Sequence, residues 1–326
     1  MQGTLLVGTV GQGIMLSSDN CDSWSRVGVS QGMHSDCVVR ALASDPGRPE
    51  LVYAGTDQGL YRSEDGGRRW SLLENPMRGS TIWSIAIDPV DPSVIFAGTG
   101  TPNEPGIYRS TDGGATWEQR PMAIAEMCPA VGIPRPTGIA IDPTDHRSIW
   151  VGFEVDGVRH SADGGESWVN LSDEIPNLDV HNMAVAGGES SVVFTVVNDD
   201  VWRSPDDGET WQAARARETF PWHYARGIAV KPNDPSTVFV TVGDATPGTI
   251  GTVMRSRDAG VSWENLELSD KPNSAMWTLN IPPVAPDTVF AASRYGYLYR
   301  SDDSGDSWRK LWRELSEVSS LLWVPK

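Results

Sequence analysis

The sequence predicts an all-β protein, a seven-bladed β-propeller of four-stranded antiparallel blades whose ring is closed by pairing of the N- and C-terminal strands. Three observations support this fold class. An eight-residue motif occurs seven times along the 326 residues. Short apolar runs alternate with turn residues, as expected for β-strands, and no segment combines the 3.6-residue apolar period of a helix with helix-capping residues. The 33 glycines and 23 prolines are typical of a chain with many turns. We therefore expect residues 1–326 to form a single propeller domain.

The repeated motif follows the pattern S-x-D-x-G-x-[ST]-W with small departures. Its copies are SSDNCDSW (17–24), SEDGGRRW (63–70), STDGGATW (110–117), SADGGESW (161–168), SPDDGETW (204–211), SRDAGVSW (256–263) and SDDSGDSW (301–308). Successive aspartates of the motif are 46, 47, 51, 43, 52 and 45 residues apart. This spacing fits one four-stranded propeller blade per copy.

The chemistry of the motif indicates a tight turn rather than a catalytic site. Its Ser and Asp side chains can bond nearby backbone groups, a glycine supplies the positive-φ position, and the Trp fills the gap between sheets. One copy follows His160, so that His, Ser and Asp lie close together in the sequence, but the repetition favours a structural role for this histidine. A glycine is replaced in four copies, by Cys21, Asp207, Ala259 and Ser304.

Each copy is preceded by strands of recognisable type. A middle strand such as VIFAGTG (94–100), TVFVTVG (237–243) or TVFAASR (288–294) is followed by a third strand such as GIYRS (106–110) or YLYRS (297–301). An innermost strand lies upstream, and the segment after each Trp forms the outer edge. The chain begins with a middle-type strand, GTLLVGT, and ends with an innermost-type strand, SSLLWVPK. We predict that these two segments complete the seventh blade and leave no unpaired sheet edge.

The motif resembles the Asp-box, or BNR, repeat of sialidase-like propellers, sortilin-type receptors, oligoxyloglucan-hydrolysing propellers and photosystem II assembly-factor propellers. This resemblance covers nearly the whole chain and implies the fold, but those families perform different functions on the same scaffold. Sialidase activity would need an arginine triad, a Tyr nucleophile with a Glu partner and an F-R-I-P stretch, whereas this chain has IPRP at 133–136. The oligoxyloglucan hydrolases use a cleft between two propellers, and this chain has the length of one.

Composition limits the classes of partner. The formal charge of -17 argues against nucleic acid and against an anionic membrane surface, because both need a basic face. The three cysteines have no C-x-x-C spacing, which argues against a disulfide framework and a structural zinc site. The N-terminal stretch has no basic leader, and no segment approaches about 18 consecutive apolar residues. We expect a soluble, cytoplasmic monomer, with a protein partner left open.

The face opposite the Asp boxes is the predicted functional face. The boxes share their face with the turns that follow the innermost strands, so the channel mouth opens on the other face, among the loops between blades and the loops after the middle strands. Aligning the innermost strands gives a first ring, Arg40, Trp83, Thr137, His181, Arg226, Trp277 and Ser320. Two residues further along lies a second ring interpreted as core, Leu42, Ile85, Ile139, Met183, Ile228, Leu279 and Leu322.

The predicted catalytic residues are His181, His223, His34 and Glu154. Three neutral imidazoles converging with a carboxylate can bind a divalent metal, so His34, His181 and His223 are the candidate metal ligands. One histidine acting as a general acid or base is the other interpretation. The sequence names no further cofactor.

The predicted substrate-binding residues are arginines and aromatics on the same face. They are Arg40, Arg226, Arg78, Arg135, Arg294, Trp83, Trp222, Tyr224, Trp277, Asn182 and Glu104. The arginines would make the channel mouth locally positive in a protein whose net charge is negative, and the aromatic rings could stack on a sugar. We therefore expect an enzyme of the hydrolase or lyase type that acts on a small anionic or carbohydrate-like substrate.

Two alternatives stay open. A glycoside hydrolase would use two carboxylates about 5 to 9 Å apart, for which the candidates are Asp57, Glu104, Glu154 and Asp244. A non-catalytic scaffold would bind a protein or peptide on the same face. If the protein is an enzyme, we expect a deep pocket with convergent polar side chains. If it is a scaffold, we expect a broad apolar patch without a metal.

Overall fold

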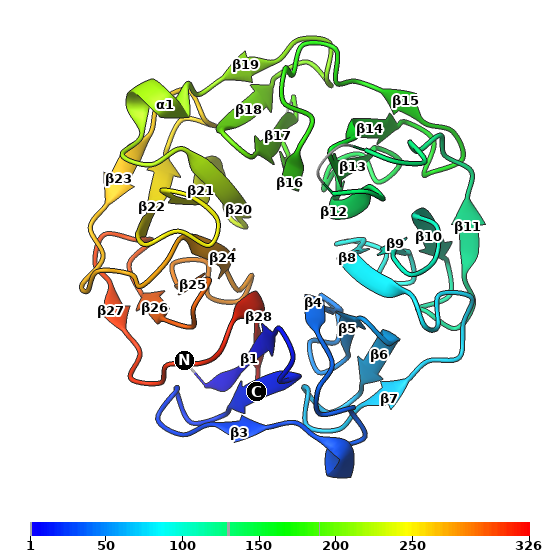
Figure 1. Cartoon of the computed structure of the whole chain (residues 1–326), viewed down its shortest axis with the longest axis vertical. Helices are drawn as coiled ribbons and strands as arrows, with labels where there is room; N and C mark the ends of the chain where they lie inside the picture. The colour runs from blue at the N-terminus through cyan, green and yellow to red at the C-terminus, as the bar shows by residue number, and fades with distance from the viewer. Residues whose placement is uncertain (1, 129–130, 189) are drawn as a thin grey trace.

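Seven four-stranded sheets surround a central channel in the computed structural model, which describes residues 2–128, 131–188 and 190–326 (Figure 1). Every sheet is antiparallel, and neighbouring sheets follow one another around the ring in chain order. The predicted seven-bladed propeller is confirmed.

We number the blades from the one that contains both ends of the chain and give each from its innermost to its outermost strand. Blade 1 is β28 (Val318–Pro325), β1 (Gly3–Thr9), β2 (Ile14–Ser17) and β3 (Ser25–Arg26). Blade 2 is β4 (Val39–Ser44), β5 (Val52–Thr56), β6 (Gly59–Ser63) and β7 (Ser71–Leu72). Blade 3 is β8 (Thr81–Ile87), β9 (Ile95–Gly100), β10 (Gly106–Ser110) and β11 (Glu118–Arg120).

The other four blades follow the same plan. Blade 4 is β12 (Arg135–Ile141), β13 (Ile149–Glu154), β14 (Gly157–Ser161) and β15 (Val169–Asn170), and blade 5 is β16 (Val180–Ala186), β17 (Val192–Val197), β18 (Asp200–Ser204) and β19 (Gln212–Ala213). Blade 6 is β20 (Tyr224–Lys231), β21 (Asp234–Gly243), β22 (Gly251–Ser256) and β23 (Glu264–Leu266). Blade 7 is β24 (Met276–Asn280), β25 (Val289–Ser293), β26 (Leu298–Ser301) and β27 (Arg309–Lys310).

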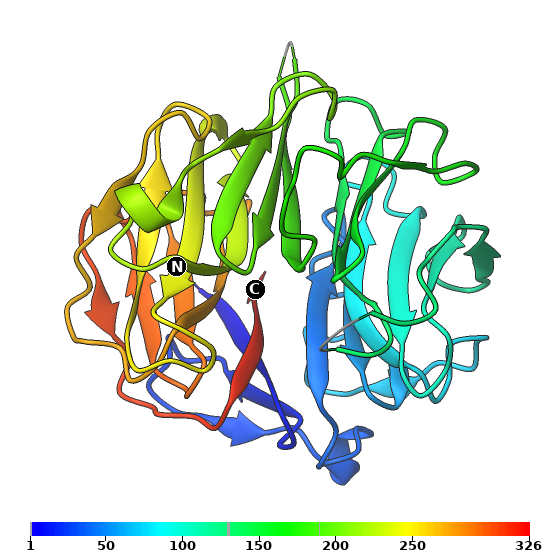
Figure 2. The same cartoon turned by 45° about the horizontal axis from the view of Figure 1, so that its top comes forward.

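The ring closes as predicted from the chain ends. Strand β28 pairs antiparallel with β1, in register from Gly3 opposite Pro325 to Gly8 opposite Ser320. Figure 2 shows the C-terminal strand beside the N-terminal ones. The pairing gives every blade four strands and covers the edge that β1 would otherwise leave open.

Helical structure in the described residues is limited to one turn of 3-10 helix (η1, Val29–Gln31) and one of α-helix (α1, Ala216–Thr219). Neither is long and apolar enough to cross a membrane.

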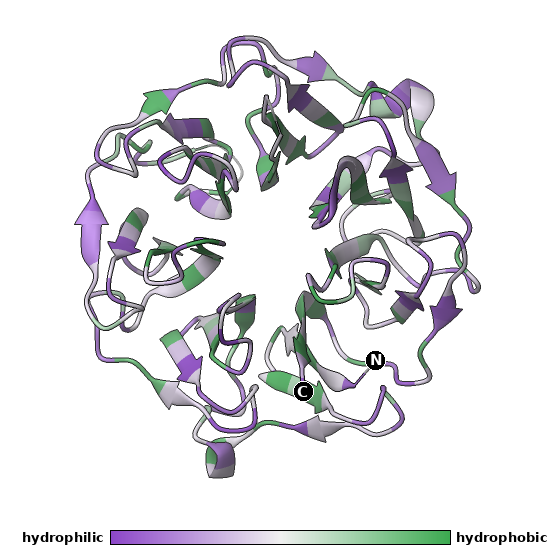
Figure 3. Ribbon diagram, turned by 180° about the vertical axis from the view of Figure 1, so that it is seen from behind, coloured by the Kyte–Doolittle hydropathy of each residue, from purple (hydrophilic) through white to green (hydrophobic). Residues whose placement is uncertain are grey.

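The core lies between blades, on the middle strands. In β5, β9, β13 and β25 every residue is buried, whereas the outermost strands are largely exposed and polar (Figure 3). The same position of the middle strand carries a fully buried aromatic residue in six blades: Tyr53, Phe96, Trp150, Phe194, Phe239 and Phe290. Because both faces of these strands are covered, they form near-continuous apolar runs rather than alternating ones.

The Asp boxes are turns between the third and the outermost strand of each blade, and their residue types predict such turns. In every copy the Ser hydroxyl donates to the Asp carboxylate, as Ser161 does to Asp163 at 2.7 Å. The backbone N–H of Gly165 donates to Ser161 Oγ at 2.7 Å, and its φ of 90° lies in the left-handed region. A Cβ on Gly165 would come within 2.9 Å of Phe96 in the preceding blade. This glycine therefore serves both the turn and the contact between blades.

The replacements of glycine keep the same backbone conformation. Cys21, Asp207, Ala259 and Ser304 all have positive φ, between 52° and 75°. His160 is structural, as predicted, because its ring stacks on Trp150 with centroids 4.0 Å apart and its Nε2 lies 2.9 Å from Ser148 Oγ.

The hydrogen bonds of the Asp boxes predict a stability change at low pH. Hydroxyl and backbone hydrogen bonds from Thr116, with one from Ser110, lower the pKa of Asp112 from 3.8 to about 2. A carboxylate with a lowered folded-state pKa stabilises the protein above the unfolded pKa, and this contribution is lost as pH falls from about 4 through 2. We expect wild type to melt above the Asp112→Asn variant at pH 6, with the difference in Tm shrinking toward zero at pH 2. A constant difference across this range would contradict the assignment.

Candidate functional site

A β-bulge on the innermost strand of each blade points one side chain into the channel. In six blades one residue of the innermost strand has no partner on the middle strand; these residues are Arg40, Trp83, Thr137, His181, Trp277 and Ser319. In blade 6 two residues, Arg226 and Gly227, have no partner. A bulge interrupts the ladder and redirects a side chain, and bulges are frequent beside active sites. Six members of the predicted first ring are therefore confirmed as equivalent. The seventh is Ser319 rather than Ser320, because the shift in β28 falls one residue earlier than the alignment predicts.

The bulged residues line a polar cavity of about 270 Å³ at the end of the channel where the innermost strands begin. The Asp boxes lie at the other end, since their backbone bonds the turns after the innermost strands, for example Gly113 N–H to Ser93 O at 2.9 Å. The predicted separation of the two faces is confirmed. Leu42, Ile85, Ile139 and Leu279, predicted as core, line the cavity beside Leu321, whereas Met183, Ile228 and Leu322 are buried in the core.

Two tryptophans in this cavity each hold two arginines. The guanidinium carbons of Arg40 and Arg135 lie 4.5 and 4.9 Å from the Trp83 ring centroid. Those of Arg226 and Arg294 lie 4.4 and 4.2 Å from the Trp277 ring centroid. Tyr224 is buried against Trp277 and His181, with centroids 6.2 and 5.2 Å apart. The indoles therefore occupy cation–π contacts and position the four guanidinium groups.

Two of the four arginines have no acidic partner among the described residues. Arg135 donates to Glu154 Oε2 at 2.9 Å and Arg294 pairs with Glu317, but Arg40 and Arg226 form no ion pair or side-chain hydrogen bond. The Nε–H of Arg40 is buried without a partner. Burial, together with the charges of Arg294, Arg135 and Arg226, lowers the pKa of Arg40 to about 10. Unpaired, half-buried guanidinium groups facing a cavity are suited to bind an anion.

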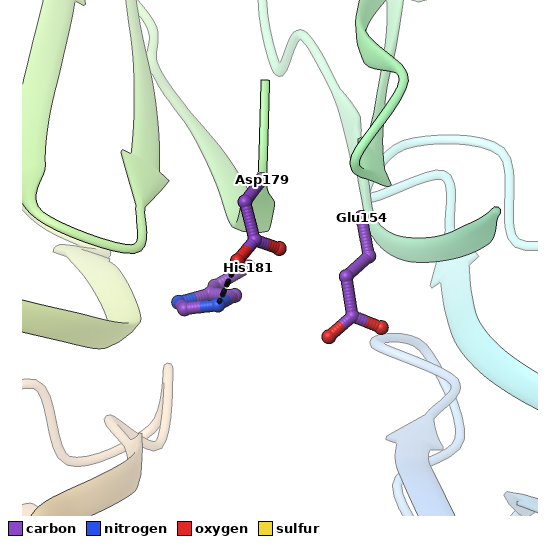
Figure 4. Close-up of side chains that lie close together, drawn as sticks. All are labelled: Glu154, Asp179 and His181. Atoms are coloured by element: carbon purple, nitrogen blue, oxygen red, sulfur yellow. Dashed lines mark ion pairs between the residues drawn. The ribbon is translucent and has the colours of Figure 1, made fainter. Parts of the chain in front are cut away.

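His181, which lines the cavity, has two carboxylates close to it, Glu154 at the end of β13 in blade 4 and Asp179 just before β16 in blade 5 (Figure 4). One ligand-type atom from each of Glu154, Asp179 and His181 lies within 4.8 Å of the others. Burial and the Arg226 charge lower the pKa of His181, which favours the neutral imidazole. Burial would raise the pKa of Asp179, but His181, Arg226 and Arg135 lower it overall.

The structure does not bring the three predicted metal-binding histidines together. His34 is exposed on the loop before β4, and His223 is half-buried with its Nε2 3.2 Å from Arg217 Nη1. The group of potential metal ligands that the described residues form contains His181 with Glu154 and Asp179 instead. The predicted trio is therefore replaced by a different set, because the carboxylates of adjacent blades approach His181 and the other histidines do not.

Other predicted site residues lie outside the cavity. Arg78 pairs with Glu74 on the surface, Trp222 lines a separate shallow pocket with Leu268, and Glu104 is exposed. Asn182 lines the cavity, and its Oδ1 accepts the Met183 N–H at 2.9 Å. Asp57 and Asp244, candidates for a glycosidase pair, accept backbone N–H groups of Val38 and Thr249 and serve local turns.

Sequence reasoning did not select Asp179 or Glu317 as site residues. Asp179 stands two positions before His181, and alternation along an extended chain places such residues on one face, so the pattern could have revealed it. Glu317 stands just before β28 and pairs with Arg294. Arg294 lies 23 positions earlier in the chain, so no local sequence pattern links the two residues.

Comparisons with known proteins agree with this fold. The family model described as "BNR/Asp-box repeat" matches residues 108–119. The chain is 26% identical to a xyloglucanase of Hypocrea jecorina over 92% of this chain and 41% of the relative, and 25% identical to xyloglucanase Xgh74A of Acetivibrio thermocellus over 81% and 37%. It spans about two fifths of the length of these curated relatives.

Solved structures with low sequence identity share the fold. A GH74 xyloglucanase from Xanthomonas campestris superposes with a TM-score of 0.70 at 19% identity, over 94% of this chain and 52% of that chain. A YCF48 structure bound to D1 peptide gives a TM-score of 0.57 at 18% identity, over 84% and 82%. The blades and the repeated turns define the class of protein, a seven-bladed β-propeller. Within that class, this chain carries seven copies of the Asp-box turn, and the BNR/Asp-box model matches the third copy.

Proposed function

We propose that this protein is an enzyme of the hydrolase or lyase type that acts on a carbohydrate carrying a negatively charged group, such as a uronic acid, bound at the mouth of the channel. The observation that carries the proposal is the pair Arg40 and Arg226, which face the cavity and form no ion pair with an acidic side chain among the described residues. Two guanidinium groups held by indoles can bind a carboxylate with little further ordering. The similarity to xyloglucanases supports the carbohydrate part of the proposal.

His181 is the proposed acid–base residue of this site. Its neutral ring can take a proton from a water or from a carbon beside the bound carboxylate, and Asp179 at 3.7 Å stabilises the charged ring that results. Arg226 neutralises the substrate anion, which lowers the cost of removing a proton next to it. His181 as the base and Arg226 as the anion-binding group fit both a hydrolase, which activates a water, and a lyase, which removes a proton from carbon.

A glycosidase that uses only paired carboxylates fits less well. Such a mechanism needs one carboxyl group that stays protonated through a raised pKa. The pKa of Asp179 is lowered, and Glu154 is tied to Arg135 by a charge-assisted hydrogen bond. Protein scaffolding through a broad apolar patch fits less well too, since arginines, a histidine and other polar side chains line the cavity together with the apolar ones.

The experiment compares acidic with neutral saccharides on the same protein. We expect calorimetry to detect binding of uronic-acid oligosaccharides, and product analysis to detect their cleavage. The same oligosaccharides with the carboxyl groups reduced to alcohols, and neutral xyloglucan oligosaccharides, should bind at least about tenfold more weakly, since one charged hydrogen bond contributes about 1.5–3 kcal/mol. Equal or tighter binding of the neutral compounds would contradict the proposal.

A further inference from the structure

The ring nitrogens of His181 have different environments that fix where its proton lies. His181 Nδ1 is 2.6 Å from the backbone oxygen of Ala225 in blade 6. A carbonyl oxygen only accepts hydrogen bonds, so Nδ1 carries the hydrogen and Nε2 of the neutral ring presents a lone pair. The bulged residue Thr137 makes the same type of bond, from its hydroxyl to Val180 O at 2.6 Å. The Nδ1–H bond is therefore part of the blade-to-blade architecture.

The lone pair of Nε2 faces acceptors and no donor. Asp179 Oδ2 lies 3.7 Å from Nε2, too far for a hydrogen bond, and the other oxygen, Oδ1, is buried without a partner. The side chain of His181 is only 3% exposed, so bulk water does not satisfy its nitrogen. A buried carboxylate oxygen without a hydrogen bond, close to an imidazole lone pair, is an arrangement that a bound cation would stabilise.

Glu154 completes this group from the neighbouring blade. It ends β13, and its Oε2 accepts from Arg135, which leaves Oε1 without a hydrogen bond among the described residues. Its carboxylate lies close to Asp179 and His181, and the dashed line in Figure 4 joins Asp179 to His181. Two carboxylates supply two negative charges, which offset the repulsion that Arg135 and Arg226 exert on a cation.

The spacing of the three ligands fits a small divalent ion. Ligand atoms at about 2.0–2.2 Å from a tetrahedral metal lie roughly 3.3–3.6 Å apart. The observed 3.7 Å between His181 Nε2 and Asp179 Oδ2, and the limit of 4.8 Å for the whole group, need only small rotations to close. A histidine that ligates a metal through one nitrogen commonly donates the other N–H to a backbone carbonyl, as His181 does.

We propose that His181 Nε2, an oxygen of Asp179 and an oxygen of Glu154 form a site for one divalent transition metal, with Zn²⁺ or Mn²⁺ as the ions best suited to one imidazole and two carboxylates. The ligand set differs from the three histidines that the sequence indicates. The metal would take the Nε2 lone pair that the proposed acid–base role of His181 uses, so His181 cannot take up a proton while it binds the metal. The proposed binding of acidic saccharides by Arg40 and Arg226 does not depend on this inference. A metal at this position would stand beside Arg226, so that an anionic ligand could contact both.

The test is a titration of chelator-treated protein with Zn²⁺ alone, by calorimetry at pH 7, followed by elemental analysis after desalting. We expect one Zn²⁺ per chain and a higher Tm with the metal than without it. The Asp179→Asn and Glu154→Gln variants should weaken Zn²⁺ binding by at least about 100-fold, since even residues that only orient ligands change metal affinity 10–100-fold. His181→Gln should have the same effect.

Matched controls separate this site from general binding to an acidic surface. His34→Gln and His223→Gln remove histidines outside the group and should leave affinity and stoichiometry unchanged. If His181→Gln does not fold because the bond to Ala225 is lost, Asp179→Asn still decides the matter, because Asp179 Oδ1 has no bond to lose. Absence of stoichiometric Zn²⁺ binding, or binding that survives Asp179→Asn, would overturn the proposal. Since no saccharide is present, these outcomes leave the proposed binding of acidic saccharides to its own experiment.

Discussion

The Trp150→Ala variant is expected to lose about 3–5 kcal/mol of its free energy of unfolding. Trp150 is fully buried on β13, stacks on His160, and meets Trp211 edge-on at a centroid distance of 6.3 Å. It also packs on Gly208 of the Asp box in blade 5, where an added Cβ would lie 2.9 Å from the indole. Because rigid sheets bound the vacated space on both sides, the structure can fill it only in part, and the cavity adds to the lost transfer free energy.

Trp312→Ala is the matched control for this prediction, since the same side chain is 99% exposed in the loop after β27. Urea unfolding monitored by circular dichroism should show a large fall in midpoint for Trp150→Ala and a change within about 0.5 kcal/mol for Trp312→Ala. A loss below about 1 kcal/mol for Trp150→Ala would mean that the seam between blades 4 and 5 repacks, contrary to the close packing described above.

The fold was predictable because the Asp box is a local structure. The bonds from Ser161 to Asp163 and from the Gly165 N–H to Ser161 lie within five residues, so the sequence of each box specifies its own turn. Strand limits followed with small errors. Strand β10 has the predicted bounds, whereas β21 begins at Asp234 rather than 237, because a tight turn continues its pairing with Lys231.

The site was predictable only in part, because it depends on bulges and on contacts between blades. Periodicity indicated which innermost residues face the channel, but a bulge shifts register by one residue without a sequence signal, which is why Ser319 replaces Ser320. The approach of Glu154 to Asp179 joins two blades and has no local pattern. The position of a loop side chain such as Arg78 depends on which residues it contacts. Arg78 forms an ion pair with Glu74 at the surface and therefore lies outside the cavity.

Replacement of Arg40 by methionine is expected to stabilise the unliganded protein while weakening its binding of anions. The lowered pKa of Arg40, about 10 against an ordinary 12.5, means that the folded protein disfavours the charged form. At neutral pH the guanidinium is charged in both folded and unfolded states, so the full penalty applies, and it would fade only as pH rises through 10. The shift corresponds to about 3 kcal/mol, whereas the cation–π contact with Trp83 contributes only about 0.5–2 kcal/mol. The net expectation is a gain of about 1–2 kcal/mol, and methionine keeps an apolar contact with the indole.

The affinity for anions should fall although the stability of the unliganded protein rises, since a bound anion relieves the repulsion among the four guanidinium groups. We expect Arg40→Met and Arg226→Gln to reduce the affinity for a digalacturonate by about 10–100-fold, which is the equivalent of one charged hydrogen bond. Thermal unfolding without ligand and calorimetry with ligand measure the two effects on the same samples. Arg78→Gln, which alters an exposed arginine outside the cavity, should change neither quantity. A lower Tm for Arg40→Met together with unchanged affinity would show that these arginines brace the tryptophans and bind no substrate. A higher Tm with lost affinity is the signature of a site that keeps its charges unpaired for a ligand.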